Sequence, residues 1–380
     1  MPKDISRRGF LKGGVSLAAG VAAGMAAGPL VLPGAAQAAS GQELCTVLDL
    51  GKCIGCEACV DACRAEWQPT VPDPVKPIPQ PFPSRVPIED WSSRKDVQDR
   101  LTPYNFLYVE HLELEGKVSE LHIPRRCMHC VNPPCTSLCP FGASRQEKNG
   151  VVHIDQDICL GGAKCKTVCP WHIPQRQSGV GLYLNLLPTL AGNGVMFKCH
   201  RCLPLVSQGK QPRCIEACPQ KVQSIGPRQE QVAKAQALAE QAAAADGRPG
   251  QWRDYLYGLE ENGGTNTLYV SPVPFAKVNA ALHELHIQQA SQEAPAKAGQ
   301  GRGQAAKGGK GLGRRLAQAG RPPMGPVANS MENPENLTLA LAIAPVAGLA
   351  AGLGRLFGGA RKLGRALEAR RQDADKGGQS

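Results

Sequence analysis

The stretch Cys53-Ile-Gly-Cys56-Glu-Ala-Cys59-Val-Asp-Ala-Cys63 places four cysteines at the spacing C-x2-C-x2-C-x3-C. Three further cysteine runs follow it along the 380-residue chain. They are Cys127, Cys130, Cys135 and Cys139; then Cys159, Cys165 and Cys169; then Cys199, Cys202, Cys214 and Cys218. These runs hold all but one of the 16 cysteines, and three of them end in Cys-Pro.

This spacing is the one that bacterial ferredoxins use to bind cubane iron–sulfur clusters. Cysteines at i, i+3 and i+6 reach three irons of one cluster, and the fourth cysteine begins a helix that leads to a second cluster. A disulfide framework does not need cysteines two residues apart in repeated blocks. A structural zinc site could use a single C-x2-C pair, but it does not need four cysteines in each run. The sequence therefore predicts four clusters.

The third run has Gly162 where a cysteine is expected. One iron there would lack a protein ligand, because glycine offers no donor. We expect three [4Fe-4S] clusters plus one [3Fe-4S] cluster, with a labile, solvent-held [4Fe-4S] cluster as the alternative. Cys45, which lies outside the runs, is predicted to be a buried core cysteine. His129 and His200 are expected beside the clusters and not on iron.

The N-terminus resembles an export signal. Residues Ser6-Arg7-Arg8-Gly9-Phe10-Leu11-Lys12 match the twin-arginine pattern, and a weakly apolar stretch then leads to Ala36-Gln37-Ala38, a small-residue cleavage site. We expect residues 1–38 to be removed and the mature chain to work on the periplasmic side of the cytoplasmic membrane. The alternative is a transmembrane anchor or a chance Arg-Arg pair.

The formal net charge of +11 lies at the two ends of the chain. Residues 1–38 carry a net charge of +3 and residues 297–380 carry +9, so the cysteine-rich body is close to neutral. Only 4% of the residues are aromatic, which leaves few side chains to stack on bases. We therefore expect no nucleic-acid partner.

Between and after the cysteine runs the chain shows four kinds of segment. Gln68–Ile88 is proline-rich and predicts an extended surface loop. Phe106–Leu114 and Lys117–Ile123 predict a hairpin that turns at Glu115-Gly116. Residues 230–245 predict a helix, and residues 291–330 predict a flexible linker.

The C-terminal part predicts a membrane anchor. Residues 337–354 carry no charge, and a span that continues to 357 is just long enough to cross a bilayer. The basic residues 358–380 would then stay in the cytoplasm. The alternative is an alanine-rich helix packed on a partner subunit.

Together these residues resemble the four-cluster iron–sulfur subunits of membrane-bound oxidoreductases. The resemblance covers residues 45–290 and rests on the four runs in this order, on Lys198-Cys199 and on Tyr257-Gly258 with the segment 263–275. The form with its own twin-arginine signal and a C-terminal tail is the periplasmic uptake hydrogenase (hydrogenase-2 type) subunit, which ordinarily has a cysteine at the position of Gly162. Nitrate reductase types lose this ligand.

The resemblance implies an α+β fold with two ferredoxin-like dicluster modules and a C-terminal helical tail. The implied domains are residues 39–125 with 195–230, residues 126–194, and a family-specific extension at 231–290. The implied ligand sets are Cys53, Cys56, Cys59 and Cys218; Cys63, Cys199, Cys202 and Cys214; Cys127, Cys130, Cys135 and Cys169; and Cys139, Cys159 and Cys165.

The function implied is electron transfer and not catalysis. We expect the chain to connect a periplasmic catalytic subunit, with NiFe hydrogenase favoured, to an integral membrane quinone-reactive subunit. The first alternative is the same role for a molybdenum or tungsten enzyme such as formate dehydrogenase or a tetrathionate or thiosulfate reductase. The second is a free-standing periplasmic ferredoxin.

Overall fold

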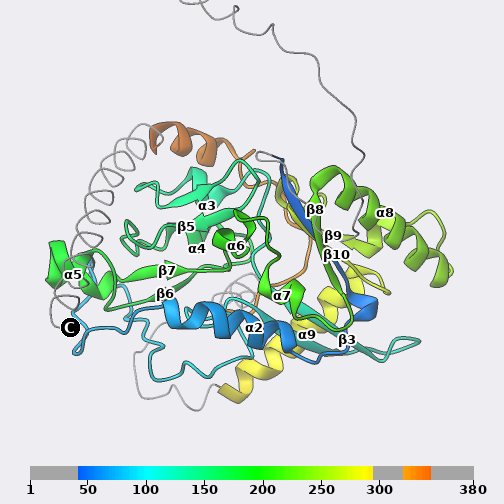
Figure 1. The fold of residues 1–380 in the computed structure, drawn as a ribbon, viewed down its shortest axis with the longest axis horizontal. Coiled ribbons are helices and arrows are strands. Elements are labelled where there is room, and N and C mark those ends of the chain that lie inside the picture. Colours follow the sequence, from blue (N-terminus) through cyan, green and yellow to red (C-terminus); the bar gives the residue numbers. More distant parts are fainter. Residues whose placement is uncertain (1–41, 294–319, 344–380) are drawn as a thin grey trace, which may run out of the picture. The chain divides into compact units, whose positions relative to one another are not determined.

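Strand β1 (Leu44–Asp49) lies inside a four-stranded sheet with the order β8-β1-β10-β9. Its neighbours are β8 (Gln223–Pro227), which is antiparallel to it, and β10 (Thr267–Val270), which is parallel; β9 (Leu256–Tyr257) completes the sheet. The computed structural model describes residues 42–293 and 320–343, so the predicted signal peptide, 1–38, lies outside the described residues. The region 231–290, predicted as an extension, thus supplies two strands of the sheet that holds β1 (Figure 1).

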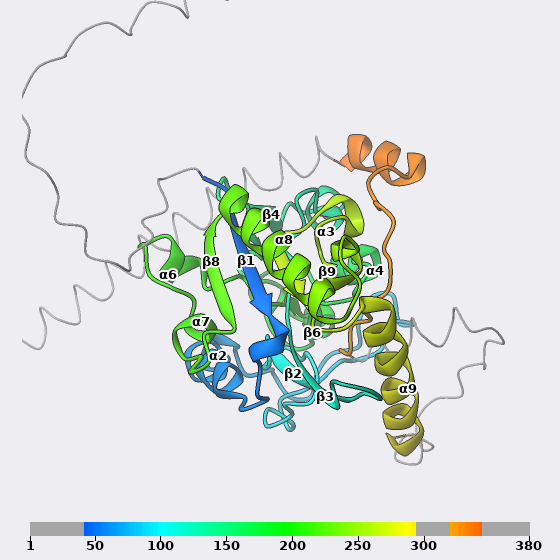
Figure 2. The same cartoon turned by 90° about the vertical axis from the view of Figure 1, so that its right-hand side faces the viewer.

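Helix α8 (Arg228–Ala245) packs against this sheet (Figure 2) and confirms the helix predicted at 230–245. Ala235, Ala239 and Ala243 recur every four residues, so they lie on one helix face, and all three are fully buried. They share a core with Cys45 and Val47 of β1. Small side chains on this face let the helix approach the sheet closely.

The predicted hairpin is confirmed, with a longer turn than expected. It consists of β2 (Tyr108–Glu113) and β3 (Glu120–Arg125), which pair from Tyr108↔Arg125 to Glu113↔Glu120. The predicted turn residues Glu115-Gly116 lie inside the connection, which Leu114 N–H closes by donating to Ser119 C=O at 2.8 Å. Helix α9 (Phe275–Glu293) lies beside this hairpin.

Most remaining elements are short and flank the cysteine loops. Two further two-stranded sheets pair β4 (Ser144–Gln146) with β5 (Val152–Ile154) and β6 (Gln175–Gln177) with β7 (Val195–Phe197). The helices are α2 (Ala58–Trp67), α3 (Pro134–Ser137), α4 (Lys164–Val168), α5 (Tyr183–Leu186), α6 (Leu203–Val206) and α7 (Arg213–Glu216), and the 3-10 turns are η1 (Leu50–Lys52), η2 (Gln68–Thr70), η3 (Pro188–Asn193), η4 (Trp252–Tyr255) and η5 (Glu261–Gly263). This mixture of helix and strand is consistent with the predicted α+β class.

The proline-rich stretch 68–88 is extended apart from η2, as predicted. It does not stand free of the body, because its backbone is bonded to the region around β6 and β7. Val75 N–H donates to Gly179 C=O at 2.9 Å, and Phe82 N–H donates to Asn193 Oδ1 at 2.8 Å. The insertion therefore forms part of the surroundings of the third cysteine run.

The linker predicted at 291–330 is wrong at its C-terminal end. Residues 320–330 pack on the body, and Arg321 and Met324 are each only 2% exposed. The guanidinium of Arg125 donates to the carbonyls of Pro322 at 2.6 Å and Pro323 at 3.0 Å. These contacts are with residues almost 200 positions away, so local composition could not reveal them.

The predicted anchor, 337–357, is described only in part. Residues 334–343 are helical, and residues 344–357 lie outside the described part of the chain, as does the predicted tail 358–380. No helix in the ranges 42–293 and 320–343 is both long enough and apolar enough to cross a membrane.

A buried polar triad joins α9 to the hairpin. Glu110 of β2 accepts a hydrogen bond from Tyr108 Oη at 2.6 Å and lies 3.0 Å from His286 Nε2, and all three side chains are buried. Burial alone would raise the pKa of Glu110, but the hydrogen bond and charge of His286 and the charge of Arg125 hold it below its usual value. The ionised carboxylate is therefore stabilised in the folded protein.

We expect Glu110→Gln to lower the free energy of unfolding at pH 7 by about 2 kcal/mol, because it removes charge-assisted hydrogen bonds. Since the folded pKa lies below the ordinary 4.5, this stabilisation is present above that pH and is lost as pH falls through the folded value. We would follow thermal unfolding by circular dichroism. The difference in melting temperature between wild type and Glu110→Gln should be constant near neutral pH and should disappear in acid. Glu113→Gln, exposed on the same strand, is the control and should match wild type. A difference in melting temperature that increased in acid would contradict an ionised, stabilising Glu110.

Candidate cluster sites

The four cysteine loops share one backbone feature. The residue before the second ligand position has a positive φ in every loop: 70° at Gly55, 49° at His129, 62° at Gly161 and 51° at Arg201. Such values are uncommon for residues other than glycine. The third loop therefore keeps the turn of the other three even though Gly162 replaces a cysteine.

Cavity I is lined by Cys53, Cys56, Cys59 and Cys218. Cys53 and Cys56 come from the loop that leads into α2, Cys59 lies in the first turn of α2, and Cys218 follows α7 at the end of the fourth run. Val222 N–H lies 3.3 Å from Cys218 Sγ and donates to it. The cavity thus joins cysteines from the first and last runs.

Cavity II is lined by Cys63, Cys199, Cys202 and Cys214. Its thiols accept hydrogen bonds from side chains of other segments. Trp67 Nε1 donates to Cys202 Sγ at 3.1 Å, and Arg126 Nη1 donates to Cys214 Sγ at 2.9 Å. Cys63 belongs to the first run but faces the cavity of the fourth.

Cavity III is lined by Cys127, Cys130, Cys135 and Cys169. Lys198 also lines it, and its Nζ donates to Cys127 Sγ at 3.4 Å. Cys169 comes from the third run, at the C-terminal end of α4. Cavity III therefore combines cysteines of the second and third runs, as cavities I and II combine cysteines of the first and fourth.

Site IV comprises Cys139, Cys159 and Cys165. Burial raises the pKa of Cys165, and the charges of Cys159, Cys135, Cys139 and Cys169 add to this effect, while the charge of Cys139 also raises the pKa of Cys159. The three thiols of site IV therefore interact with one another and with two cysteines of cavity III. Met196 N–H donates to Cys159 Sγ at 3.5 Å. Gly162 is exposed, and a Cβ added there would meet nothing within 4 Å.

Without a bound cation, the thiols of the cavities favour their neutral, protonated form. Burial, reinforced by neighbouring thiolates, raises the pKa of Cys59 and Cys202 to about 12, and burial does the same for Cys169. Metal ligation removes such protons, because a cation replaces them. Among the described residues, no three His, Cys, Asp or Glu side chains come together as the ligand set of one metal ion.

Two buried cations beside the cavities fit an anionic group within them. Burial alone would lower the pKa of Arg126 and Lys198, but thiolates raise both: chiefly Cys214 for Arg126 and Cys127 for Lys198. Arg126 Nη2 is buried without a hydrogen-bond partner in the described chain, and a sulfide of a bound cluster would supply an acceptor. Sequence reasoning did not assign these residues, although each directly precedes the first cysteine of a run.

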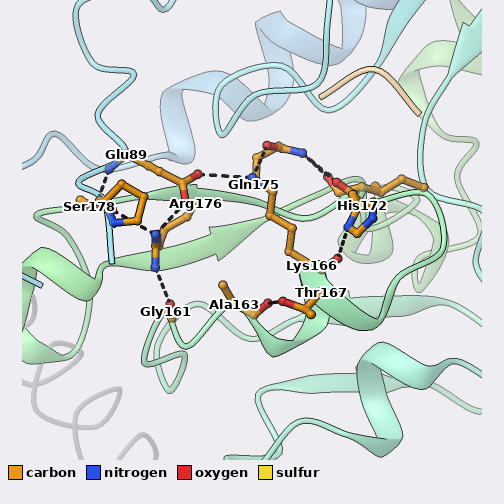
Figure 3. Close-up of polar contacts among 11 residues, drawn as sticks. Glu89, Gly161, Ala163, Lys166, Thr167, His172, Gln175, Arg176 and Ser178 are labelled. Carbon is orange, nitrogen blue, oxygen red and sulfur yellow. Dashed lines mark hydrogen bonds and ion pairs between the residues drawn. The ribbon is translucent and has the colours of Figure 1, made fainter. Parts of the chain in front are cut away.

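A polar network from the proline-rich insertion supports site IV (Figure 3). Arg176 of β6 is 4% exposed and donates to Gly161 C=O at 3.3 Å and to Glu89 Oε1 at 2.7 Å. Lys166 of α4 reaches the other oxygen of Glu89 at 3.4 Å and Gln175 Oε1 at 3.1 Å. Arg176 also donates to Pro87 C=O at 3.1 Å, so the insertion and the adjacent Glu89 together hold the third cysteine loop from outside.

The predictions for the remaining sulfur and imidazole groups agree with the structure. Cys45 is fully buried in the core of β1 and α8. His129 accepts the Val152 N–H at 3.0 Å, and its Nε2 lies 3.9 Å from Cys199 Sγ. His200 packs edge-on against Trp67. Both histidines lie beside cluster cysteines or their neighbours, and that neither binds iron stays a prediction.

Known proteins resemble this chain over the same region. Residues 52–143 and 118–228 each match a family described as the 4Fe-4S dicluster domain. The thiosulfate reductase electron transfer subunit PhsB of Salmonella typhi is 30% identical over 179 residues, which covers 47% of this chain and 72% of that protein. This chain belongs to the iron–sulfur electron-transfer subunits of oxidoreductase complexes.

Two further relatives extend the likeness of this iron–sulfur subunit. The hydrogenase-2 operon protein HybA of Escherichia coli O157:H7 is 28% identical over 256 residues, covering 60% of this chain and 69% of that protein. The nitrate-inducible formate dehydrogenase iron–sulfur subunit of Escherichia coli K12 is 29% identical over 231 residues, covering 60% and 68%. The family resemblance read from the cysteine runs is confirmed.

Gly162→Cys should complete site IV, because the position is open and its backbone is not left-handed. In the anaerobically purified subunit we expect about one more iron per chain and loss of the EPR signal of an oxidised three-iron cluster. Gly161→Cys is the control, since its Cβ would lie 2.0 Å from Asn193 C=O; it should disrupt the loop without adding iron. Unchanged iron content and signal in G162C would show that position 162 does not face a cluster.

Proposed function

We propose that this subunit holds three [4Fe-4S] clusters in cavities I, II and III and one [3Fe-4S] cluster at site IV, and passes electrons along them. Each cluster, when bound, takes up and releases one electron, while the protein sets its potential through ligands, hydrogen bonds and burial. The observation that carries the proposal is the meeting of cysteines from distant runs around one cavity, three times over.

The exchange of cysteines supports a linear order of the sites. Cys63 leaves the loop of cavity I to line cavity II, and Cys218 does the reverse, so these two cavities are neighbours. Cavity III and site IV are linked in the same way by Cys139 and Cys169. Lys198 links the pair of cavities I and II to the pair of cavity III and site IV. Its side chain donates to Cys127 of cavity III, and it directly precedes Cys199 of cavity II. The proposed order is therefore I, II, III, IV.

The proposed partners are a periplasmic catalytic subunit and an integral membrane quinone-reactive subunit. A NiFe hydrogenase is favoured by the similarity to HybA and by the twin-arginine pattern at residues 6–12. Gly162 favours the second candidate, a molybdopterin oxidoreductase, as do the formate dehydrogenase and thiosulfate reductase relatives. The export signal and the segment 337–357 support a place on the periplasmic side of the cytoplasmic membrane, anchored by the tail.

Metal analysis of the complex purified anaerobically from solubilised membranes decides between these partners. Nickel together with a large subunit would support the hydrogenase. Molybdenum or tungsten would support the molybdopterin enzyme. Iron without any partner would contradict both and favour a free-standing ferredoxin.

Cys53→Ala removes one thiol from cavity I, and we expect the complex to lose one cluster and at least about tenfold of its quinone-linked turnover. Turnover measured with an artificial dye at the catalytic subunit should persist, since the catalytic subunit is unchanged. Cys45→Ala, a buried cysteine in the core of α8 and β1, is the matched control and should keep all iron and full turnover. Undiminished quinone-linked turnover in C53A would contradict electron transfer through cavity I.

A further inference from the structure

The basic residues Arg126 and Lys198 directly precede the second and fourth cysteine runs, and each donates a hydrogen bond to a cysteine of the other run. Arg126 directly precedes Cys127 of cavity III, yet its guanidinium donates to Cys214 of cavity II at 2.9 Å. Lys198 directly precedes Cys199 of cavity II, yet its ammonium donates to Cys127 of cavity III at 3.4 Å. Each cation therefore belongs in sequence to one dicluster module and in space to the other.

Both side chains are part of the cavity walls. Arg126 lines cavity II and Lys198 lines cavity III, and each residue is only 5% exposed. The charges that act most strongly on Lys198 are the thiolates of Cys127 and Cys135, and Cys214 and Cys199 act most strongly on Arg126. A buried cation is costly unless an anion faces it, so these two residues are matched to the charge of the cavities.

Neighbouring basic residues show that position before a cysteine is not sufficient. Lys52 directly precedes Cys53, but its side chain is 56% exposed and forms an ion pair with Asp49 at 2.8 Å. Arg201 is buried, but its guanidinium is bonded to the carbonyls of Leu44 at 2.6 Å and Asn266 and to Thr267 Oγ1 at 3.1 Å. Lys198 Nζ also donates to the carbonyls of Val152 at 2.5 Å and Cys199 at 3.1 Å. Arg126 and Lys198 differ from both Lys52 and Arg201 because a thiol sulfur also accepts a side-chain N–H from each of them.

A fixed positive charge beside a redox group favours its more negative, reduced form. The effect is strong in a buried site, where water does not screen it, and hydrogen bonds to sulfur act in the same direction. With clusters bound, an electron that crosses the junction of the two modules would leave one cluster and reduce the next, with no bond made or broken. The potentials of the clusters in cavities II and III decide how easily this step runs in either direction.

We propose that Arg126 and Lys198 are a reciprocal pair of potential-setting residues, in which each raises the reduction potential of the cluster in the other run's module. The inference rests on the proposed binding of clusters in cavities II and III. Because both central potentials are raised together, the pair leaves the difference between them little changed. Removing one cation lowers one potential only and so changes the difference that an electron meets at the junction.

The test is an EPR-monitored redox titration of the complete complex carrying Lys198→Met. At a fixed ambient potential we expect the ratio of reduced to oxidised cluster in cavity III to fall about tenfold, which is 59 mV for a one-electron couple. Arg126→Met should do the same for cavity II. Lys198→Arg keeps the charge and should restore most of the potential, and Lys52→Met is the control that should change neither.

Iron content is measured on every variant, so that loss of potential control and loss of a cluster are told apart. Full iron content with unshifted potentials in K198M and R126M would overturn the proposal and leave cluster binding intact. If K198M lost iron, the pair R126M and R126K would decide, because equal cavity II potentials in the two would also overturn it. Absence of iron from the wild-type subunit would instead refute the proposed function.

Discussion

The structure depends on bringing thiols from distant parts of the chain to one small buried space. Cavity I needs Cys218 from the end of the fourth run, and cavity II needs Cys63 from the first. Strand β1 enters the first loop and pairs with β8, which follows the fourth. The β1–β8 pairing thus holds together the two runs that share cavities I and II. The sheet of β4 and β5 lies between the second and third runs in sequence, and the sheet of β6 and β7 lies between the third and fourth.

Charge is the second constraint. Grouped thiolates in a protein interior repel one another and lose hydration, which is why burial raises the pKa values of the cysteines so far. Buried cations, backbone N–H groups and the indole of Trp67 are placed against the sulfurs. Although the net charge of the cysteine-rich body is close to zero, its interior therefore places buried positive groups directly against the cysteine sulfurs.

Site IV shows that loop shape and ligand number are separate properties. The third loop has the positive φ at Gly161 that the other loops share, and Arg176 and Glu89 brace it from outside. Gly162 is nevertheless open to solvent and without a donor. The fold has therefore kept the turn while one ligand is missing, with the proline-rich insertion supplying part of the support.

Sequence alone determined the chemistry, because cluster ligation is written in local cysteine spacing. It also predicted the hairpin of β2 and β3, the helix α8 and the burial of Cys45, all of which depend on patterns within a few turns of the chain. Tertiary structure decided the rest. Three features rest on contacts between residues far apart in sequence. They are the packing of residues 320–330, the hydrogen bond of Arg176 to Gly161, and the hydrogen bonds of Arg126 and Lys198 to cysteines of the other module. Such contacts leave no periodic or compositional trace, since only the fold brings their partners within hydrogen-bonding distance.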